Sequence, residues 1–195
     1  KSKGPLIVES SITNIFHILK KSPLGPIGCF VAGMLNSAFY GLTPIFGKEI
    51  GLSILQISQI MGFTILGGLA LQWPIGHLSD IFNRRKVLIA VAFTLMILTF
   101  ILFYSQSFSY PVLVGLLVLF GGVSFTIYPL SITFTCDHFS PKKVIGITCS
   151  LLITFGVGCV CGPLISPIFM GLVGPSGLFL YMSVLCAIFV LIGMW

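Results

Sequence analysis

The residues best suited to electrostatic chemistry lie in one short stretch, from Gly76 to Lys86. The chain carries only ten Lys or Arg and four Asp or Glu residues among 195. Four of these charges, Asp80 and the basic group Arg84-Arg85-Lys86, fall inside this stretch, and long apolar runs flank it on both sides. Charge is costly in lipid, so the cluster marks a segment held in water. The stretch predicts a tight cytoplasmic hairpin between two membrane helices.

The sequence contains no complete set of catalytic or metal-binding residues. It has no Ser-His-Asp combination and no HExxH motif, and a hydrolase needs a positioned nucleophile, base or metal. His17, His77 and His138 all fall at predicted interfaces. The pair Cys136 and His138 lacks a second ligand pair, and the cysteine spacing fits no zinc or disulfide template. We therefore expect no enzyme activity, no metal and no cofactor.

Uncharged polar residues occur within the apolar runs. Asn36 and Tyr40 are four residues apart and share one helical face, Gln72 lies near the end of a second run, and Tyr128 lies in a fourth. Such groups are costly toward lipid, so they should face a partner helix or a cavity. Two interpretations stay open for these four residues: contacts between helices, or contacts with a solute.

Small residues form a second pattern in the fifth run. Gly158 and Gly162 make a small-xxx-small pair, and Pro163 follows directly. Small residues let helix backbones approach closely in lipid, whereas Gly combined with Pro can also bend a helix. The pattern predicts helix packing at these residues, with a functional kink as the alternative.

The composition requires most of the chain to lie in a bilayer. Hydrophobic residues make up 56% of it and charged residues 7%, and about 20 apolar residues span a membrane as a helix. The short alternating strands of a membrane barrel are absent. We therefore predict an all-α integral membrane protein of six helical runs, in which Pro163 and Pro167 can kink the fifth run or end it early. The six runs span residues 24–47, 55–76, 87–105, 111–135, 144–168 and 177–195.

The basic residues assign the runs an orientation. Lys20-Lys21, Arg84-Arg85-Lys86 and Lys142-Lys143 alternate with connections whose only basic residue is Lys48, beside Glu49. Basic residues favour the cytoplasmic side, so both ends of the chain are expected in the cytoplasm. The basic residues behind the net charge of +6 come in small groups at segment ends rather than as a basic stripe interleaved with aromatics, so nucleic-acid binding is not expected.

Residues 1–23 are predicted to form a cytoplasmic linker, ahead of a transmembrane bundle over residues 24–195. Ile12, Ile15, Phe16 and Leu19 share one helical face, which predicts an amphipathic helix lying on the membrane. Ser10 or Ser11 would cap its start. The alternative is a disordered linker. Because the chain begins with Lys, we expect it to be part of a longer polypeptide.

Three features together resemble the major facilitator superfamily over nearly the whole chain. The hairpin has the pattern of the superfamily's signature loop, from Gly76 through Asp80 to Arg84-Arg85-Lys86. Six runs with cytoplasmic ends match one half of a twelve-helix fold. Gly158-x-x-x-Gly162-Pro163 is similar to a Gly-Pro motif of antiporter-type members. Ile81 replaces a usual basic residue and Asn83 a usual Gly, a position where Asn tolerates a left-handed turn.

The resemblance implies which half this is and what the signature loop does. The degenerate loop and the basic lead-in point to the C-terminal half, whereas the Gly-Pro motif is usual in the N-terminal half. Asp80 would face a helix N-terminus of the opposite half, and Arg84 or Arg85 would pair with Asp80 or Asp137. These contacts would hold one access state closed. The alternative is that Gly76, Asp80 and Arg84-Arg85-Lys86 only anchor the topology.

The resemblance also implies a function. The chain would be half of a secondary transporter that moves a small solute by alternating access, with or without a coupling proton. The first and fourth helices of each half line the cavity, which makes Asn36, Tyr40 and Tyr128 candidate solute contacts. The partners would be the lipid bilayer, the other half and the solute. Similarity of residues 23–44 and 128–163 to a bacterial branch implies a bacterial inner membrane. The alternative is a non-transporting scaffold or sensor with the same fold.

Overall fold

Helices make up most of the described chain. The structure, a computed structural model, describes residues 15–195. Its α-helices are α1 (Ile15–Lys21), α2 (Leu24–Glu49), α3 (Ile54–Ile81), α4 (Arg84–Phe103), α5 (Tyr110–Cys136), α6 (Val144–Val173) and α7 (Gly177–Met194), with short 3-10 turns at η1 (Ser105–Ser107) and η2 (Pro141–Lys143).

Six of these helices, α2 to α7, are long and apolar enough to cross a membrane. They confirm the predicted all-α, six-span architecture. Two predicted ends were wrong: α3 reaches Ile81 rather than residue 76, and α6 continues through Pro163 and Pro167 to Val173 rather than residue 168. Membrane helices tolerate proline where neighbouring helices and side chains compensate the backbone. The end of α6 comes instead at Gly174, where φ is +85°, a conformation that glycine adopts readily.

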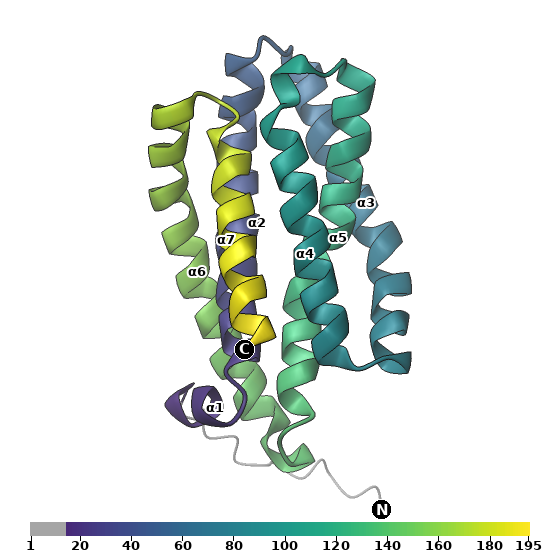
Figure 1. Ribbon diagram of the computed structural model, residues 1–195, viewed down its shortest axis with the longest axis vertical. Helices are drawn as coiled ribbons and strands as arrows, with labels where there is room; N and C mark the ends of the chain where they lie inside the picture. The colour runs from purple at the N-terminus through teal and green to yellow at the C-terminus, as the bar shows by residue number, and fades with distance from the viewer. Residues whose placement is uncertain (1–14) are drawn as a thin grey trace, which may run out of the picture.

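The helices run antiparallel in chain order, so their links alternate between the two ends of the bundle (Figure 1). The lower end in Figure 1 holds α1, the α3–α4 link, the α5–α6 link and the C-terminus. The basic groups of the sequence therefore gather at this lower end, and Lys48 with Glu49 lies at the upper end. The connections rich in basic residues, which alternate along the sequence with connections that have few, therefore all lie at the same end of the bundle.

The packing follows a repeat of three helices. The most extensive pairs are α2 with α6, α3 with α5, and α4 with α7. The first three membrane helices (α2, α3, α4) correspond in order to the last three (α5, α6, α7). Under this correspondence the pair α2–α6 becomes α5–α3, so the two sets of three helices pack against each other in equivalent ways. This is the arrangement of the internal repeats found within transporter halves. Aromatic side chains fill the centre, with ring centroids 5.1 Å apart for Phe39 and Phe120 and 5.0 Å apart for Phe46 and Phe179.

Glycines set the closest approach of α2 and α6. A Cβ on Gly158 would meet the backbone carbonyl of Phe30, and a Cβ on Gly162 would meet that of Met34. From the other side, a Cβ on Gly33 would meet the backbone of α6. Gly158 and Gly162 thus lie where α2 and α6 touch backbone to backbone, a geometry that favours packing over a kink as their role.

The equivalent pair, α3 with α5, uses the same device. A Cβ on Gly67 would meet the backbone of Val118, and a Cβ on Gly121 would meet the backbone of Thr64. The first three membrane helices are therefore joined to the last three through backbone contacts at glycines that no larger residue could make.

The described part of the lead-in is the short helix α1, packed on the lower end of the bundle. Ile18 is fully buried in a cluster with Ile147 and Leu151, whereas Phe16 is 76% exposed. The predicted apolar face, chosen by helical spacing from Ile12, omitted Ile18, which is the buried residue of α1 and shares its cluster with Ile15. Ile12 and the proposed caps Ser10 and Ser11 lie outside the described residues.

Candidate functional site

Most of the charged stretch from Gly76 to Lys86 is helical, whereas its composition predicts a loop. Helix α3 extends to Ile81 and α4 begins at Arg84, so only Phe82 and Asn83 link them. Asn83 has φ −61° and ψ 115°, and its side-chain oxygen accepts a hydrogen bond from the Arg85 backbone N–H at 3.0 Å. The expected left-handed turn at Asn83 is wrong, because an N-cap needs extended backbone. The predicted hairpin from Gly76 is instead the last turn and a half of α3.

Arg84 joins two carboxylates from different helices. Its Nη1 donates to both oxygens of Asp137, at 2.8 and 2.9 Å, and its Nη2 donates to Asp80 Oδ1 at 2.9 Å. The side chain of Arg84 is 29% exposed, against 64% for Asp80 and 50% for Asp137. One guanidinium at the start of α4 therefore ties together the lower ends of α3 and α5.

Arg85 makes a different contact. Its Nε and Nη2 donate to the carbonyl of Gly193, at 3.3 and 3.1 Å, which caps one of the unpaired carbonyls at the end of α7. Sequence reasoning expected either arginine to pair with either aspartate, whereas the structure gives both aspartates to Arg84 and sends Arg85 to α7. The two arginines together connect four helices at one end of the bundle.

Each charge in this cluster lies at the helix end that disfavours it. Arg84 stands at the N-terminus of α4, while Asp80 and Asp137 stand at the C-termini of α3 and α5. The helix macrodipole makes a cation unfavourable at an N-terminus and an anion unfavourable at a C-terminus. These residues therefore do not stabilise their own helices, and their mutual pairing offsets the unfavourable positions.

Gly76 and Lys86, the other residues of the signature stretch, lie outside the Arg84–Asp80–Asp137 ion pairs. A Cβ built on Gly76 would have no atom within 4 Å, so packing among the described helices does not require glycine there. Lys86 is exposed and borders a groove of ≈ 510 Å³ between α3 and α4.

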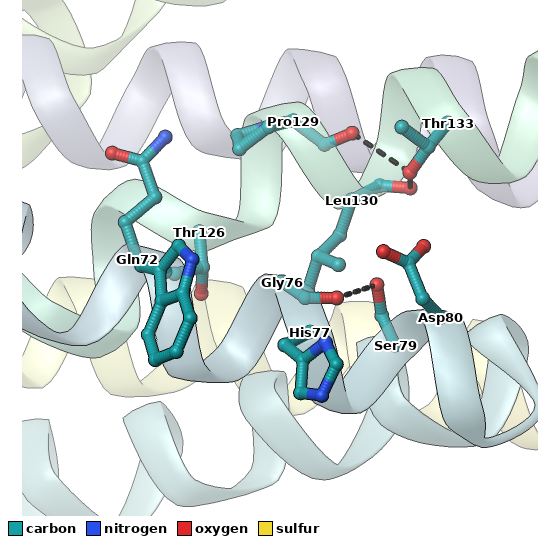
Figure 2. Close-up of a pocket in the computed structure, with 10 residues that line it drawn as sticks. Gln72, Gly76, His77, Ser79, Asp80, Thr126, Pro129, Leu130 and Thr133 are labelled. Atoms are coloured by element: carbon teal, nitrogen blue, oxygen red, sulfur yellow. Dashed lines mark hydrogen bonds between the residues drawn. The ribbon is translucent and has the colours of Figure 1, made fainter.

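A cavity of ≈ 370 Å³ lies between α3 and α5, beside Asp80. Figure 2 shows its polar lining, where the Ser79 hydroxyl donates to the Gly76 carbonyl at 2.7 Å and the Thr133 hydroxyl contacts the Pro129 and Leu130 carbonyls at 3.0 Å. The lining residues are Gln72, Trp73, Gly76, His77, Ser79, Asp80, Thr126, Pro129, Leu130 and Thr133.

The predicted solute-lining residues do not meet in one place. Gln72 lines the cavity beside Asp80. Asn36 is half-buried and accepts a hydrogen bond from the Ser124 hydroxyl at 3.4 Å. Tyr40 is 42% exposed and stacks on Phe125 of α5, with ring centroids 6.1 Å apart.

Tyr128 lies on another side of α5. Its ring is 4.6 Å from that of Phe155 on α6. Asn36 and Tyr40 thus contact residues of α5 that do not line the cavity, and Tyr128 belongs to the α5–α6 contact.

Sequence reasoning did not group Trp73 with His77 or Thr126 with Thr133. The Trp73 and His77 rings lie parallel, 6.0 Å apart, and each of these two pairs borders the cavity. The signal was helical spacing, four residues in α3 and seven in α5, which places each pair on one face. Among residues 15–195, no three His, Cys, Asp or Glu side chains gather to hold a metal ion.

Comparison with known proteins assigns the family. A model described as Major Facilitator Superfamily matches residues 17–195. The "Uncharacterized MFS-type transporter YcaD" proteins of Escherichia coli strains UMN026 and HS are each 30% identical to this chain over 183 residues, which is 94% of this chain and 46% of the relative. The chain therefore spans about half the length of the curated relatives it matches. With six membrane-spanning helices and a family match over nearly its whole length, the chain belongs to the major facilitator superfamily.

Proposed function

We propose that this chain forms one half of a secondary transporter that moves a small solute by alternating access, with Arg84 at the gate of its lower end. The family assignment and the six helices support transport in general. The observation that carries the gate is the single guanidinium of Arg84 bound to Asp80 of α3 and Asp137 of α5. Its rupture would free the ends of both helices together.

The exposure of this cluster suits a gate. Asp80 and Asp137 are at least half exposed, and ion pairs between exposed groups contribute about 0.2–1 kcal/mol each. A contact of that strength biases an equilibrium between two states without locking it. A fully buried pair would cost several kcal/mol to break and would hold the protein in one state.

The other half would pack against the face that carries Gly76 and Asp80. These residues are four apart and both border the cavity of ≈ 370 Å³. The open space around Gly76 leaves room for a second backbone, and the exposed Asp80 carboxylate would suit the positive N-terminus of a helix. On this proposal, a glycine is needed at position 76 because the other half of the transporter packs there, and not because of contacts within this chain.

The orientation follows from charge. The lower end carries all the described basic groups except Lys48, so we place it in the cytoplasm. The bacterial relatives support an inner-membrane location. Charged residues lie only near the ends of α2 to α7, so a carboxylate for proton coupling would come from the other half.

Transport itself is tested with the full-length protein that contains this chain. Purified and reconstituted in liposomes, it is expected to move at least one member of a panel of sugars, amino acids, organic ions and drugs. A pH gradient that drives accumulation identifies proton coupling, whereas flux that ignores the gradient identifies facilitated diffusion. Binding without flux for every bound solute would favour the scaffold or sensor instead.

Asp80→Asn is expected to lower solute flux about tenfold, because it removes the charge that Arg84 and the other half share and affects the balance of two states. Membrane insertion and yield should stay unchanged. The measurement is initial uptake in liposomes, with Glu49→Gln at the opposite end as the matched control. Wild-type flux in Asp80→Asn would leave the stretch as a topology anchor.

Asn36→Ala and Tyr40→Phe separate solute contact from packing. Tyr40→Phe keeps the ring stacked on Phe125 and removes only the hydroxyl. We expect each change to weaken apparent solute affinity about threefold to tenfold, the size of one hydrogen bond, in transport titrations. Ser124→Ala, which removes the partner of Asn36, is the control for positioning. Unchanged affinity with a lower melting temperature would assign both residues to packing.

A further inference from the structure

A second cavity, separate from the gate, lies at the lower end of the bundle. Its volume is ≈ 710 Å³, and it is bounded by the α1–α2 link, the start of α4 and the ends of α5 and α7. These segments meet near the C-terminus in Figure 1. Lys21, Ser22, Arg85, His138, Leu191 and Trp195 are among its lining residues.

The charged side chains that line this cavity are basic. Lys21 and Arg85 line it, and no Asp or Glu does. The acidic residues described at this end, Asp80 and Asp137, are both bound by Arg84. Arg85 is held in place by the Gly193 carbonyl, so its guanidinium is positioned without being neutralised. An anion is the ligand that this charge distribution favours.

Ser22 provides an independent sign of a ligand. Its side chain is only 3% exposed, it lines the cavity, and its hydroxyl has no hydrogen-bond partner among the described residues. Buried hydroxyls normally have a partner, because leaving one unpaired costs free energy. The oxygen itself is covered in this structure, and a rotation of the Ser22 side chain toward the cavity would let the hydroxyl donate to a phosphate oxygen held at Lys21.

The remaining wall is apolar and open to the outside of the bundle. Leu191, on the last turn of the membrane-spanning helix α7, is 64% exposed, and Trp195 directly follows that helix. A ligand seated here would meet positive charge at one end and exposed hydrocarbon at the other. A phospholipid has that division, whereas a free phosphate would use only the charged end.

We propose that this cavity binds the headgroup of an anionic phospholipid from the adjacent leaflet. The phosphate contacts Lys21, Arg85 and the Ser22 hydroxyl, and an acyl chain runs along Leu191 on α7. Basic pockets between membrane helices at the headgroup level bind such lipids in this way. The site is independent of the transported solute and of the gate at Arg84.

The test uses the full-length protein in phosphatidylcholine nanodiscs that contain increasing amounts of phosphatidylglycerol with a photoreactive acyl chain. Cross-links are expected to saturate on the α7 peptide that contains Leu191. Lys21→Gln should raise the lipid fraction needed for half-saturation about fivefold, the contribution of one basic residue near the surface, and Ser22→Ala should raise it about threefold. Lys142→Gln removes the same charge at the same end and should have no effect.

Several outcomes would overturn the proposal. Equal loss in Lys21→Gln and Lys142→Gln would mean general attraction of anionic lipid to a basic surface. Displacement of the lipid by excess inorganic phosphate would identify a soluble anion as the ligand. No saturable cross-link at α7 would show that lipid does not enter the cavity. Because Arg85 also caps α7, the charge test rests on Lys21, whose replacement leaves the arginine contacts in place.

Discussion

Gly158→Val is expected to destabilise the protein more than any other single change considered, by about 3 kcal/mol or more. The new side chain would collide with the backbone carbonyl of Phe30, and backbone cannot move aside as a flexible side chain can. Overpacking in a well-filled interior typically costs about 1–3 kcal/mol, and two whole helices would have to separate here. The measurement is yield of folded full-length protein and its melting temperature in detergent.

Gly156→Val is the matched control for this prediction. It lies two residues away in the same helix, and a Cβ built there meets nothing within 4 Å. Both variants add the same β-branched residue to α6, so any difference reports the contact with α2. Equal melting temperatures for the two variants would mean that α2 and α6 do not pack through this face.

Arg84→Gln should open the lower end of the full-length transporter. The change releases Asp80 and Asp137 together and leaves each carboxylate at a helix C-terminus that disfavours it. Two exposed ion pairs at about 0.2–1 kcal/mol each give a shift of about twofold to thirtyfold in the balance of states, whereas the helix-end terms are the same in both states and cancel. In a background without other cysteines, Gln72→Cys should react with an impermeant maleimide faster by a similar factor when Arg84→Gln is added.

Two variants control for charge alone in this measurement. Lys86→Gln removes a nearby positive charge that has no carboxylate contact among the described residues, so labelling at Gln72 should stay at its starting rate. Arg84→Lys keeps the charge but loses the fork that reaches two carboxylates, so its rate should fall between the other two. If Arg84→Gln and Lys86→Gln label alike, Arg84 is not the residue that holds this end closed.

The sequence was sufficient to predict the six membrane helices and the end of the bundle where the basic residues gather. Both properties depend only on residues close together in the sequence. A span needs about 20 apolar residues in a row, and the cost of placing a charged side chain in the hydrocarbon core keeps such residues near the helix ends. The extent of α3 and α6 was less accessible. Helix α3 continues through Asp80 to Ile81, and Asn83 then caps the start of α4. Helix α6 passes two prolines, which membrane helices tolerate where neighbouring helices compensate the backbone.

Only the tertiary structure decided which residues meet. Asp137 is 53 residues from Arg84, and Gly193 is 108 residues from Arg85, so no local pattern could assign the two arginines to different partners. The same holds for Gly158, whose contact is a backbone atom of another helix, and for Ser22, whose unpaired hydroxyl becomes visible only when its surroundings are known. Apolar run length fixes helices one at a time, whereas partners depend on how all six helices share a limited set of close contacts.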